Sequence, residues 1–116
     1  MNTNIGFLDQ GTPHIVVLGA GAIGGYIGGC LAVAGANVSF LGRTKMLDIV
    51  KTHGYRLTDL YGRHSKLAPS EIQFTTEAKV LKLADFVLVA VKSRDTLAAA
   101  ELLRMHAKPN VTIISF

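Results

Sequence analysis

Apolar residues along the chain form short continuous runs, and segments with helical patterns separate these runs. The run of β-branched and aliphatic residues at 14–19 is typical of a strand buried on both faces, and the run at 86–91 predicts a further buried strand. Strands are also predicted at 37–41 and 111–116. Apolar spacing and capping residues predict helices over 22–34, 44–53, 76–83 and 93–105. Because strands alternate with helices throughout, we predict an α/β fold of the Rossmann type, an open parallel sheet with helices on both faces.

Residues suited to helix ends support these boundaries. Thr44 and Ser93 carry side-chain oxygens that can cap an amino end, and Ser93 is expected to act as a cap rather than as a ligand. Asp95 falls in a first turn, where the helix dipole favours an acid. Gly35 follows the helix over 22–34 and is expected to be its C-cap.

The remaining segments are less regular. Residues 55–67 predict a small edge hairpin that turns near Tyr61-Gly62, and its role is left open. Ile72 and Phe74 alternate with polar residues, which indicates a short strand. The polar residues 1–13 are expected to form a flexible tail ahead of a single domain.

A glycine-rich turn joins the first predicted strand to the first predicted helix. This turn matches the pattern G-x-G-x-x-G through Gly19, Ala20, Gly21, Ala22, Ile23 and Gly24. Gly19 permits a tight turn, Gly21 lets the backbone approach a pyrophosphate, and Gly24 lets the helix pack closely on the strand. The free N–H groups of the helix then face the phosphates. We therefore predict that all six residues contact a dinucleotide, the alternative being a glycine-rich helix that only packs.

The residue after the second strand indicates which dinucleotide binds. NAD-type sites usually carry Asp or Glu about twenty residues beyond the glycine turn, where it binds the ribose 2′-hydroxyl. Arg43 stands there instead, and Asp48 lies inside the next helix. A guanidinium can hold a 2′-phosphate through charge-assisted hydrogen bonds, so the sequence favours NADP(H) over NAD(H). The alternative is that Arg43 is an ordinary surface arginine.

Lys92 is a third candidate for cofactor binding. It follows the buried strand at 86–91, as Gly19 and Arg43 follow theirs. In an open α/β sheet, ligands bind beyond the carboxyl ends of the strands, so these three residues are expected to line one crevice. A solvated lysine at a strand end is the alternative.

Composition narrows the classes of partner. The net charge is +4 over 116 residues, with an isoelectric point near 9.5. The basic residues are scattered and are not interleaved with aromatic ones, which argues against nucleic acid as a partner. The sequence contains neither a signal-peptide pattern nor an apolar segment of membrane-spanning length, so we expect no membrane partner and a cytoplasmic location.

The cysteine and histidine residues give no sign of a metal or catalytic site. Cys30 is the single cysteine and falls within a predicted helix, where a small buried apolar residue is expected. The four histidines have neither metal-ligand spacing nor a catalytic partner. We expect them to be structural or surface residues and predict no metal ligand.

Three segments together resemble the N-terminal part of ketopantoate reductases (2-dehydropantoate 2-reductases). They are Ile-Val-Val-Leu-Gly-Ala-Gly-Ala-Ile-Gly-Gly at 15–25, Leu-Gly-Arg at 41–43 and Asp-Phe-Val-Leu-Val-Ala-Val-Lys-Ser at 85–93. The resemblance implies reduction of a 2-oxo acid, ketopantoate to pantoate, with NADPH in pantothenate biosynthesis. It also implies that residues 19–24 bind the pyrophosphate, Arg43 the 2′-phosphate, and Lys92 the cofactor region of the crevice.

The same resemblance implies that this chain is the NADP-binding domain alone, over 14–116. The family adds a C-terminal helical domain that carries a catalytic lysine and a substrate-binding acid, and an Asn-Gly pair follows the strand at 111–116. These parts lie outside the sequence, so no catalytic residue is predicted here and the chain is expected to be inactive alone. Exposure of the docking face would favour a homodimer.

Two other interpretations stay open. One is a stand-alone NADP(H)-binding regulatory module, and the other is the Rossmann half of a different two-domain dehydrogenase. Sequence beyond Phe116 would separate the first from a reductase, because a reductase continues into a helical domain.

Overall fold

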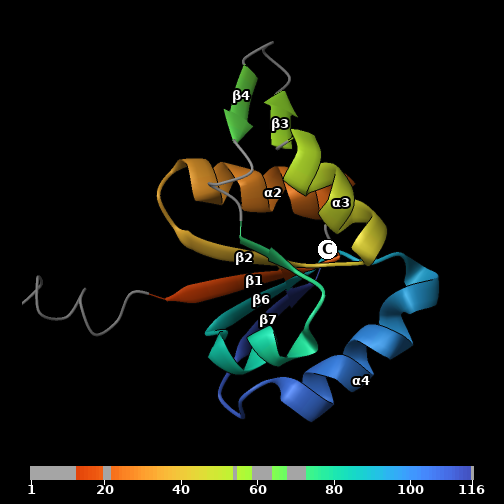
Figure 1. The fold of residues 1–116 in the computed structure, drawn as a ribbon. Helices are drawn as coiled ribbons and strands as arrows, with labels where there is room; N and C mark the ends of the chain where they lie inside the picture. The colour runs from red at the N-terminus through yellow and green to blue at the C-terminus, as the bar shows by residue number, and fades with distance from the viewer. Residues whose placement is uncertain (1–12, 20–21, 54, 59–63, 68–72, 116) are drawn as a thin grey trace, which may run out of the picture.

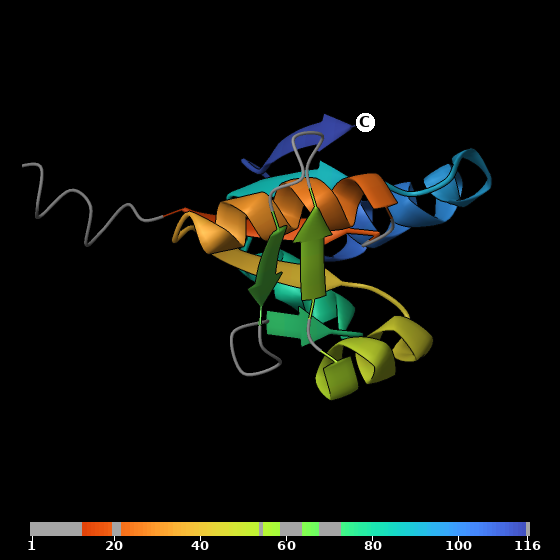
Figure 2. The ribbon, with the colours of Figure 1, turned by 90° about the horizontal axis from the view of Figure 1, so that it is seen from above.

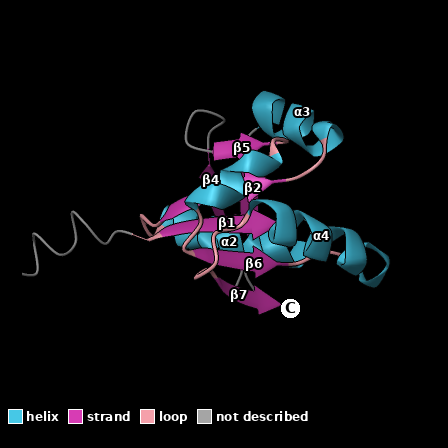
Figure 3. Ribbon diagram, turned by 90° about the horizontal axis from the view of Figure 1, so that it is seen from below, coloured by secondary structure: helices cyan, strands magenta, loops and turns pink. Residues whose placement is uncertain are grey.

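A five-stranded parallel sheet forms the centre of the protein (Figures 1 and 3). The computed structural model describes residues 13–19, 22–53, 55–58, 64–67 and 73–115. The strands are β1 (His14–Leu18), β2 (Asn37–Leu41), β5 (Gln73–Thr75), β6 (Phe86–Val89) and β7 (Thr112–Ser115). They lie in the order β5-β2-β1-β6-β7, and every pairing is parallel. The predicted Rossmann-type sheet is confirmed.

Helices cover both faces of this sheet, as predicted. They are α2 (Ala22–Val33), α3 (Thr44–His53) and α4 (Thr96–His106), with 3-10 helices η2 (Ala78–Leu83) and η3 (Ser93–Asp95). Figure 1 shows α2 on one side of the sheet and α4 with η2 on the other. The segment predicted as a helix over 76–83 is thus a shorter 3-10 helix. A segment of this length is too short for apolar spacing to distinguish the two helix types.

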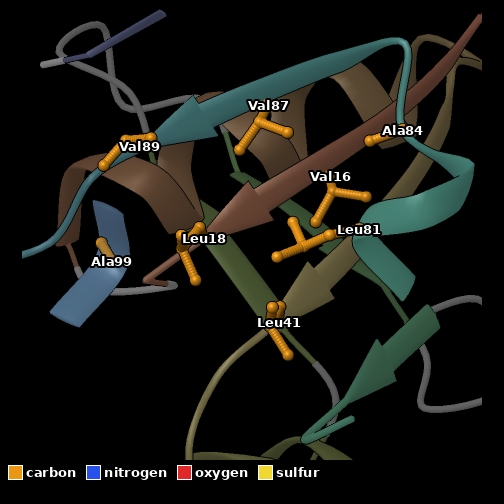
Figure 4. Close-up of a cluster of buried hydrophobic side chains, with 8 residues drawn as sticks. All are labelled: Val16, Leu18, Leu41, Leu81, Ala84, Val87, Val89 and Ala99. Carbon is orange, nitrogen blue, oxygen red and sulfur yellow. The ribbon is translucent and has the colours of Figure 1, made fainter. Parts of the chain in front are cut away.

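Side chains alternate between the two sides of β1, and this alternation divides the core into two clusters. Val16 and Leu18 point toward η2 and α4, where they join the cluster drawn in Figure 4. Val17 points the other way and packs with Phe40 in the cluster beneath α2. Since both faces of β1 are covered, its residues form the continuous apolar run seen in the sequence.

The carboxyl end of α2 closes as predicted at Gly35, which has a φ of +96°. The Gly35 N–H donates to the Ala32 carbonyl at 3.0 Å, and the Ala36 N–H donates to the Leu31 carbonyl at 3.0 Å. This pair of hydrogen bonds is the Schellman motif. It turns the chain sharply from α2 into β2.

Gly28 brings α2 close to the sheet. A Cβ atom at this position would lie 2.7 Å from Phe40 Cε1 and 2.7 Å from Val17 Cγ2. Both neighbours are fully buried side chains of the cluster beneath α2. The close approach of this helix to the sheet therefore depends on Gly28, to which the motif gave no role. The packing role predicted for Gly24 stays a prediction.

The prediction that Cys30 is buried is wrong, because its side chain is exposed. It lies on the outer surface of α2 with Tyr26 and Val33, which are 41% and 50% exposed. Spacings of four and three residues place these side chains on one helical face. The helix contains no charged residue that would have marked this face as the outer one.

The predicted hairpin is confirmed as an antiparallel pair of β3 (Tyr55–Thr58) and β4 (His64–Leu67). The pair lies against the outer side of α2, away from the sheet (Figures 1 and 2). The predicted turn at Tyr61-Gly62 and the tail over 1–13, except for Pro13, lie outside the described residues. So does Ile72, whereas Phe74 lies in β5 as expected.

A chain of polar groups crosses the sheet near the amino end of β1. The Ser39 hydroxyl donates to Gln73 Oε1 at 2.9 Å and lies 2.8 Å from His14 Nε2. Because the hydroxyl has a single hydrogen, the imidazole N–H donates to it. The His14 backbone N–H donates to Asp85, whose carboxylate also accepts from Lys108 at 2.6 Å. These bonds satisfy polar groups that the sheet partly buries.

Burial lowers the pKa of His14 below its usual 6.5, with a smaller contribution from Lys108, while Asp85 opposes the shift. The unfolded chain therefore takes up a proton before the folded chain does, and stability falls as pH drops below about 6.5. We expect His14→Gln, which keeps an amide donor, to flatten this part of the profile. Urea unfolding at pH values from 7.5 to 5 measures the free energy of unfolding of both proteins. If it falls equally steeply with pH in the wild type and in His14→Gln, His14 is not the cause of the loss.

Candidate functional site

A crevice with a volume of about 650 Å³ opens at the carboxyl ends of the central strands. Its lining includes residues at the strand ends, namely Leu18 and Gly19 at the end of β1, Leu41 and Gly42 at the end of β2, and Ala90 and Val91 directly after β6. From β1 the chain moves outward through β2 to β5, then returns to add β6 and β7 on the other side. The crevice therefore lies at the topological switch point, where open α/β sheets bind ligands.

The turn out of β1 has the geometry predicted for Gly19. Its φ is +88°, and an added Cβ would lie 2.7 Å from Val91 Cγ1 and 3.1 Å from the Ala90 carbonyl oxygen. The Gly19 N–H donates to the Leu41 carbonyl at 3.1 Å. Gly19 thus connects the ends of three adjacent strands, and a side chain would not fit there.

The rest of the glycine motif is described only in part. Ala20 and Gly21 lie outside the described residues, and α2 begins at Ala22. Ile23 and Gly24 belong to the first turn of α2, whose backbone N–H groups are free of helical partners. Contacts between these residues and a cofactor stay a prediction.

Among the residues that the structure describes, four cationic side chains line the crevice. Arg43 follows β2 and Lys92 follows β6, so the structure brings both together with Gly19 as the sequence predicted. Lys45 and Arg94 also line the crevice, and sequence reasoning missed them. Each stands two residues beyond a predicted cation, so the rule that found Arg43 and Lys92 could have found them too. The crevice is therefore suited to an anionic ligand.

Asp95 supplies an acid that sequence reasoning did not place in the crevice. Its Oδ1 lies 3.5 Å from Arg43 Nη2, and the side chains are 32% and 84% exposed respectively. The search for an acid considered only the segment after β2, whereas Asp95 follows β6. Tertiary structure brings these two residues together although 52 positions separate them.

The predicted capping role of Ser93 is wrong. Residues 93–95 form η3, held by a hydrogen bond of 2.8 Å from the Asp95 N–H to the Lys92 carbonyl. The α-helix starts only at Thr96, so the capping position falls on Asp95. Asp95 makes no side-chain capping bond. Thr44 is itself the first residue of α3.

The described lining of the crevice contains no histidine and no cysteine, and Asp95 is its one acid. Among the described residues, no three side chains of His, Cys, Asp or Glu are grouped so as to hold a metal ion. None of the helices in the described ranges combines the length and apolar character needed to cross a bilayer. Its charged lining among the described residues is thus mostly cationic.

A second pocket, of about 530 Å³, lies beside β5 and η2. Its lining includes Ser39 and Phe74 together with Lys79 and Lys82. Its described lining contains no glycine turn and no residue of an α-helix. The crevice at the switch point is therefore the better candidate.

The strand order, and the positive-φ glycine turn at the switch point, define the fold class as a Rossmann-type α/β domain. Residues 15–116 match the family model described as "Ketopantoate reductase PanE/ApbA". The chain belongs to the ketopantoate reductase family, which confirms the resemblance seen in the sequence.

Individual relatives agree with this membership. The chain is 37% identical over 91 residues to a 2-dehydropantoate 2-reductase of Halobacterium salinarum, covering 78% of this chain and 29% of that protein. It is 32% identical over 88 residues to the same-named protein of Mesorhizobium japonicum, covering 75% of this chain and 26% of that protein. A ketopantoate reductase structure from Ralstonia solanacearum superposes with a TM-score of 0.75 at 33% identity, covering 89% of this chain and 31% of that one. The chain thus spans less than a third of the length of these relatives.

Proposed function

We propose that the crevice binds NADP(H) and that the chain is the cofactor-binding part of an oxidoreductase that reduces a 2-oxo acid. The observation that carries this proposal is Arg43, which stands beside the glycine turn with no acid directly after β2. Within the family, the substrate would be ketopantoate and the product pantoate, for pantothenate biosynthesis in the cytoplasm.

The residues present fit such a cofactor. Gly19 makes the tight turn out of β1 at a φ of +88°, and the first turn of α2 offers free N–H groups to a pyrophosphate. Arg43 would hold the 2′-phosphate, and Lys92 would hold a group on the opposite wall. When bound, the nicotinamide supplies hydride chemistry, and the chain binds and orients it.

We propose further that this chain alone does not turn over substrate. The described lining of the crevice offers no histidine or cysteine for proton transfer, and its acid is paired with Arg43. We expect no ketopantoate-dependent loss of NADPH absorbance with the 116-residue chain, even where NADPH binds. Steady turnover by the isolated chain would contradict this. The family's catalytic lysine would then be unnecessary.

The decisive experiment on cofactor choice is calorimetric titration with NADPH and, separately, with NADH. Arg43→Ala should cost about 1.5–3 kcal/mol of binding free energy for NADPH and little for NADH, because a charge-assisted hydrogen bond to phosphate is lost. Arg104→Ala is the matched control, since this arginine pairs with Glu101 on α4 and does not line the crevice. Equal affinity for both cofactors in the wild type would refute the NADP(H) assignment.

A homodimer stays a prediction. Large apolar side chains are exposed along α4 and β7, including Leu97 at 79%, Met105 at 64% and Ile113 at 48%. Such side chains favour association with another surface, whether a second copy or a further domain of a longer enzyme.

A further inference from the structure

The ion pair between Arg43 and Asp95 joins the two walls of the crevice. Arg43 comes from the end of β2, and Asp95 comes from the turn that follows β6. The Arg43 side chain is 84% exposed and long, whereas Asp95 is 32% exposed and short. A hydrogen bond from the Asp95 N–H to the Lys92 carbonyl and the start of α4 fix the Asp95 backbone. The carboxylate is therefore the fixed partner, and the guanidinium is the partner that can move.

A carboxylate at this place acts oppositely on phosphorylated and unphosphorylated ligands. An ionised carboxylate only accepts hydrogen bonds, so it can bind a ribose hydroxyl but repels a phosphate. In dinucleotide sites an acid performs the first task from the segment directly after the second strand. Here the acid arrives from another element and lies 3.5 Å from the cation that would hold the phosphate.

We propose that Asp95 is a specificity-determining residue that holds the preference for NADPH over NADH below the value that Arg43 would give by itself. This inference rests on the proposed binding of NADP(H) at the crevice. Asp95 neutralises part of the Arg43 charge and opposes a 2′-phosphate, while it can accept a hydrogen bond from the 2′-hydroxyl of NADH. The crevice thus combines a phosphate-binding cation with an acid suited to the unphosphorylated cofactor.

The test is the ratio of the NADH and NADPH dissociation constants, measured by calorimetry at one ionic strength. Asp95→Asn removes the charge, keeps the size and leaves a residue favoured at helix amino ends, so the fold should be retained. We expect the preference for NADPH to rise about three- to tenfold, as suits a partly exposed charge pair. Glu101→Gln is the matched control, because it removes a carboxylate that pairs with Arg104 outside the crevice.

The outcomes separate this inference from the proposed function. If Arg43→Ala weakens NADPH binding but Asp95→Asn leaves the ratio unchanged, the inference fails and the proposed function stands. Weaker NADPH binding in Asp95→Asn would also overturn the inference, since the carboxylate would then be orienting Arg43 for the phosphate. If Arg43→Ala has no effect on NADPH, both proposals fail.

Discussion

Gly28→Val is expected to destabilise the domain by about 3 kcal/mol, at the upper end of the usual cost of overpacking a core. The first added atom would already lie 2.7 Å from Phe40 Cε1 and 2.7 Å from Val17 Cγ2. Neither neighbour has free space to move into, because both are fully buried between α2 and the sheet. The helix would have to move away from the sheet, which would open the cluster beneath it.

Urea unfolding measures this effect, and Gly35→Ala provides the contrast. Gly35 has a φ of +96° but no atom within 4 Å of an added Cβ. Its replacement should cost only about 1 kcal/mol of backbone strain. A loss in Gly28→Val no larger than in Gly35→Ala would show that α2 can shift without cost. If Gly28→Ala destabilises a Phe40→Leu variant less than it destabilises the wild type, the Phe40 ring is the group that the added Cβ meets.

The importance of Gly28 could not be deduced from the sequence, for a physical reason. The residues of α2 are apolar or small throughout, so the sequence has no polar face to fix the rotation of the helix about its axis. The G-x-G-x-x-G pattern assigned close packing to Gly24, which stays a prediction, and gave no role to Gly28. The burial of Cys30 was misjudged because no polar residue marks the outer face of α2. In a helix with charged residues, the sequence does show which face is exposed. In α4, for example, Glu101 and Arg104 mark the outer face.

The strands β1, β2 and β6 were predictable because helices cover the sheet on both faces there. Apart from His14, Asn37 and Ser39, the residues of these three strands are apolar, so they stand out from the rest of the chain. The rule that ligands bind at the carboxyl ends of the strands then predicted that Gly19, Arg43 and Lys92 line one crevice, as they do. Asp95 was missed because that rule was not applied beyond Lys92, and only the three-dimensional fold brings its carboxylate to Arg43.

Gly19→Ala should remove most of the affinity for NADPH, by at least about tenfold, and should also destabilise the fold. Two costs act together at this position. The φ of +88° carries a strain of about 1–2 kcal/mol for a residue with a Cβ, and that Cβ would lie 2.7 Å from Val91 Cγ1. Relief requires the turn to move away from β6, which would displace the amino end of α2 that we expect to face the pyrophosphate.

A second substitution separates these two costs. Val91→Ala removes the methyl group nearest to the added Cβ, but leaves the Ala90 carbonyl oxygen at 3.1 Å and the positive φ unchanged. In the Gly19→Ala, Val91→Ala double variant, we therefore expect part of the stability to return while NADPH binding stays weak. Calorimetric titration measures the NADPH affinity of the double variant, and urea unfolding of the same samples measures its stability. Recovery of full NADPH affinity in the double variant would mean that the side-chain clash alone matters and that the backbone of the turn tolerates a Cβ.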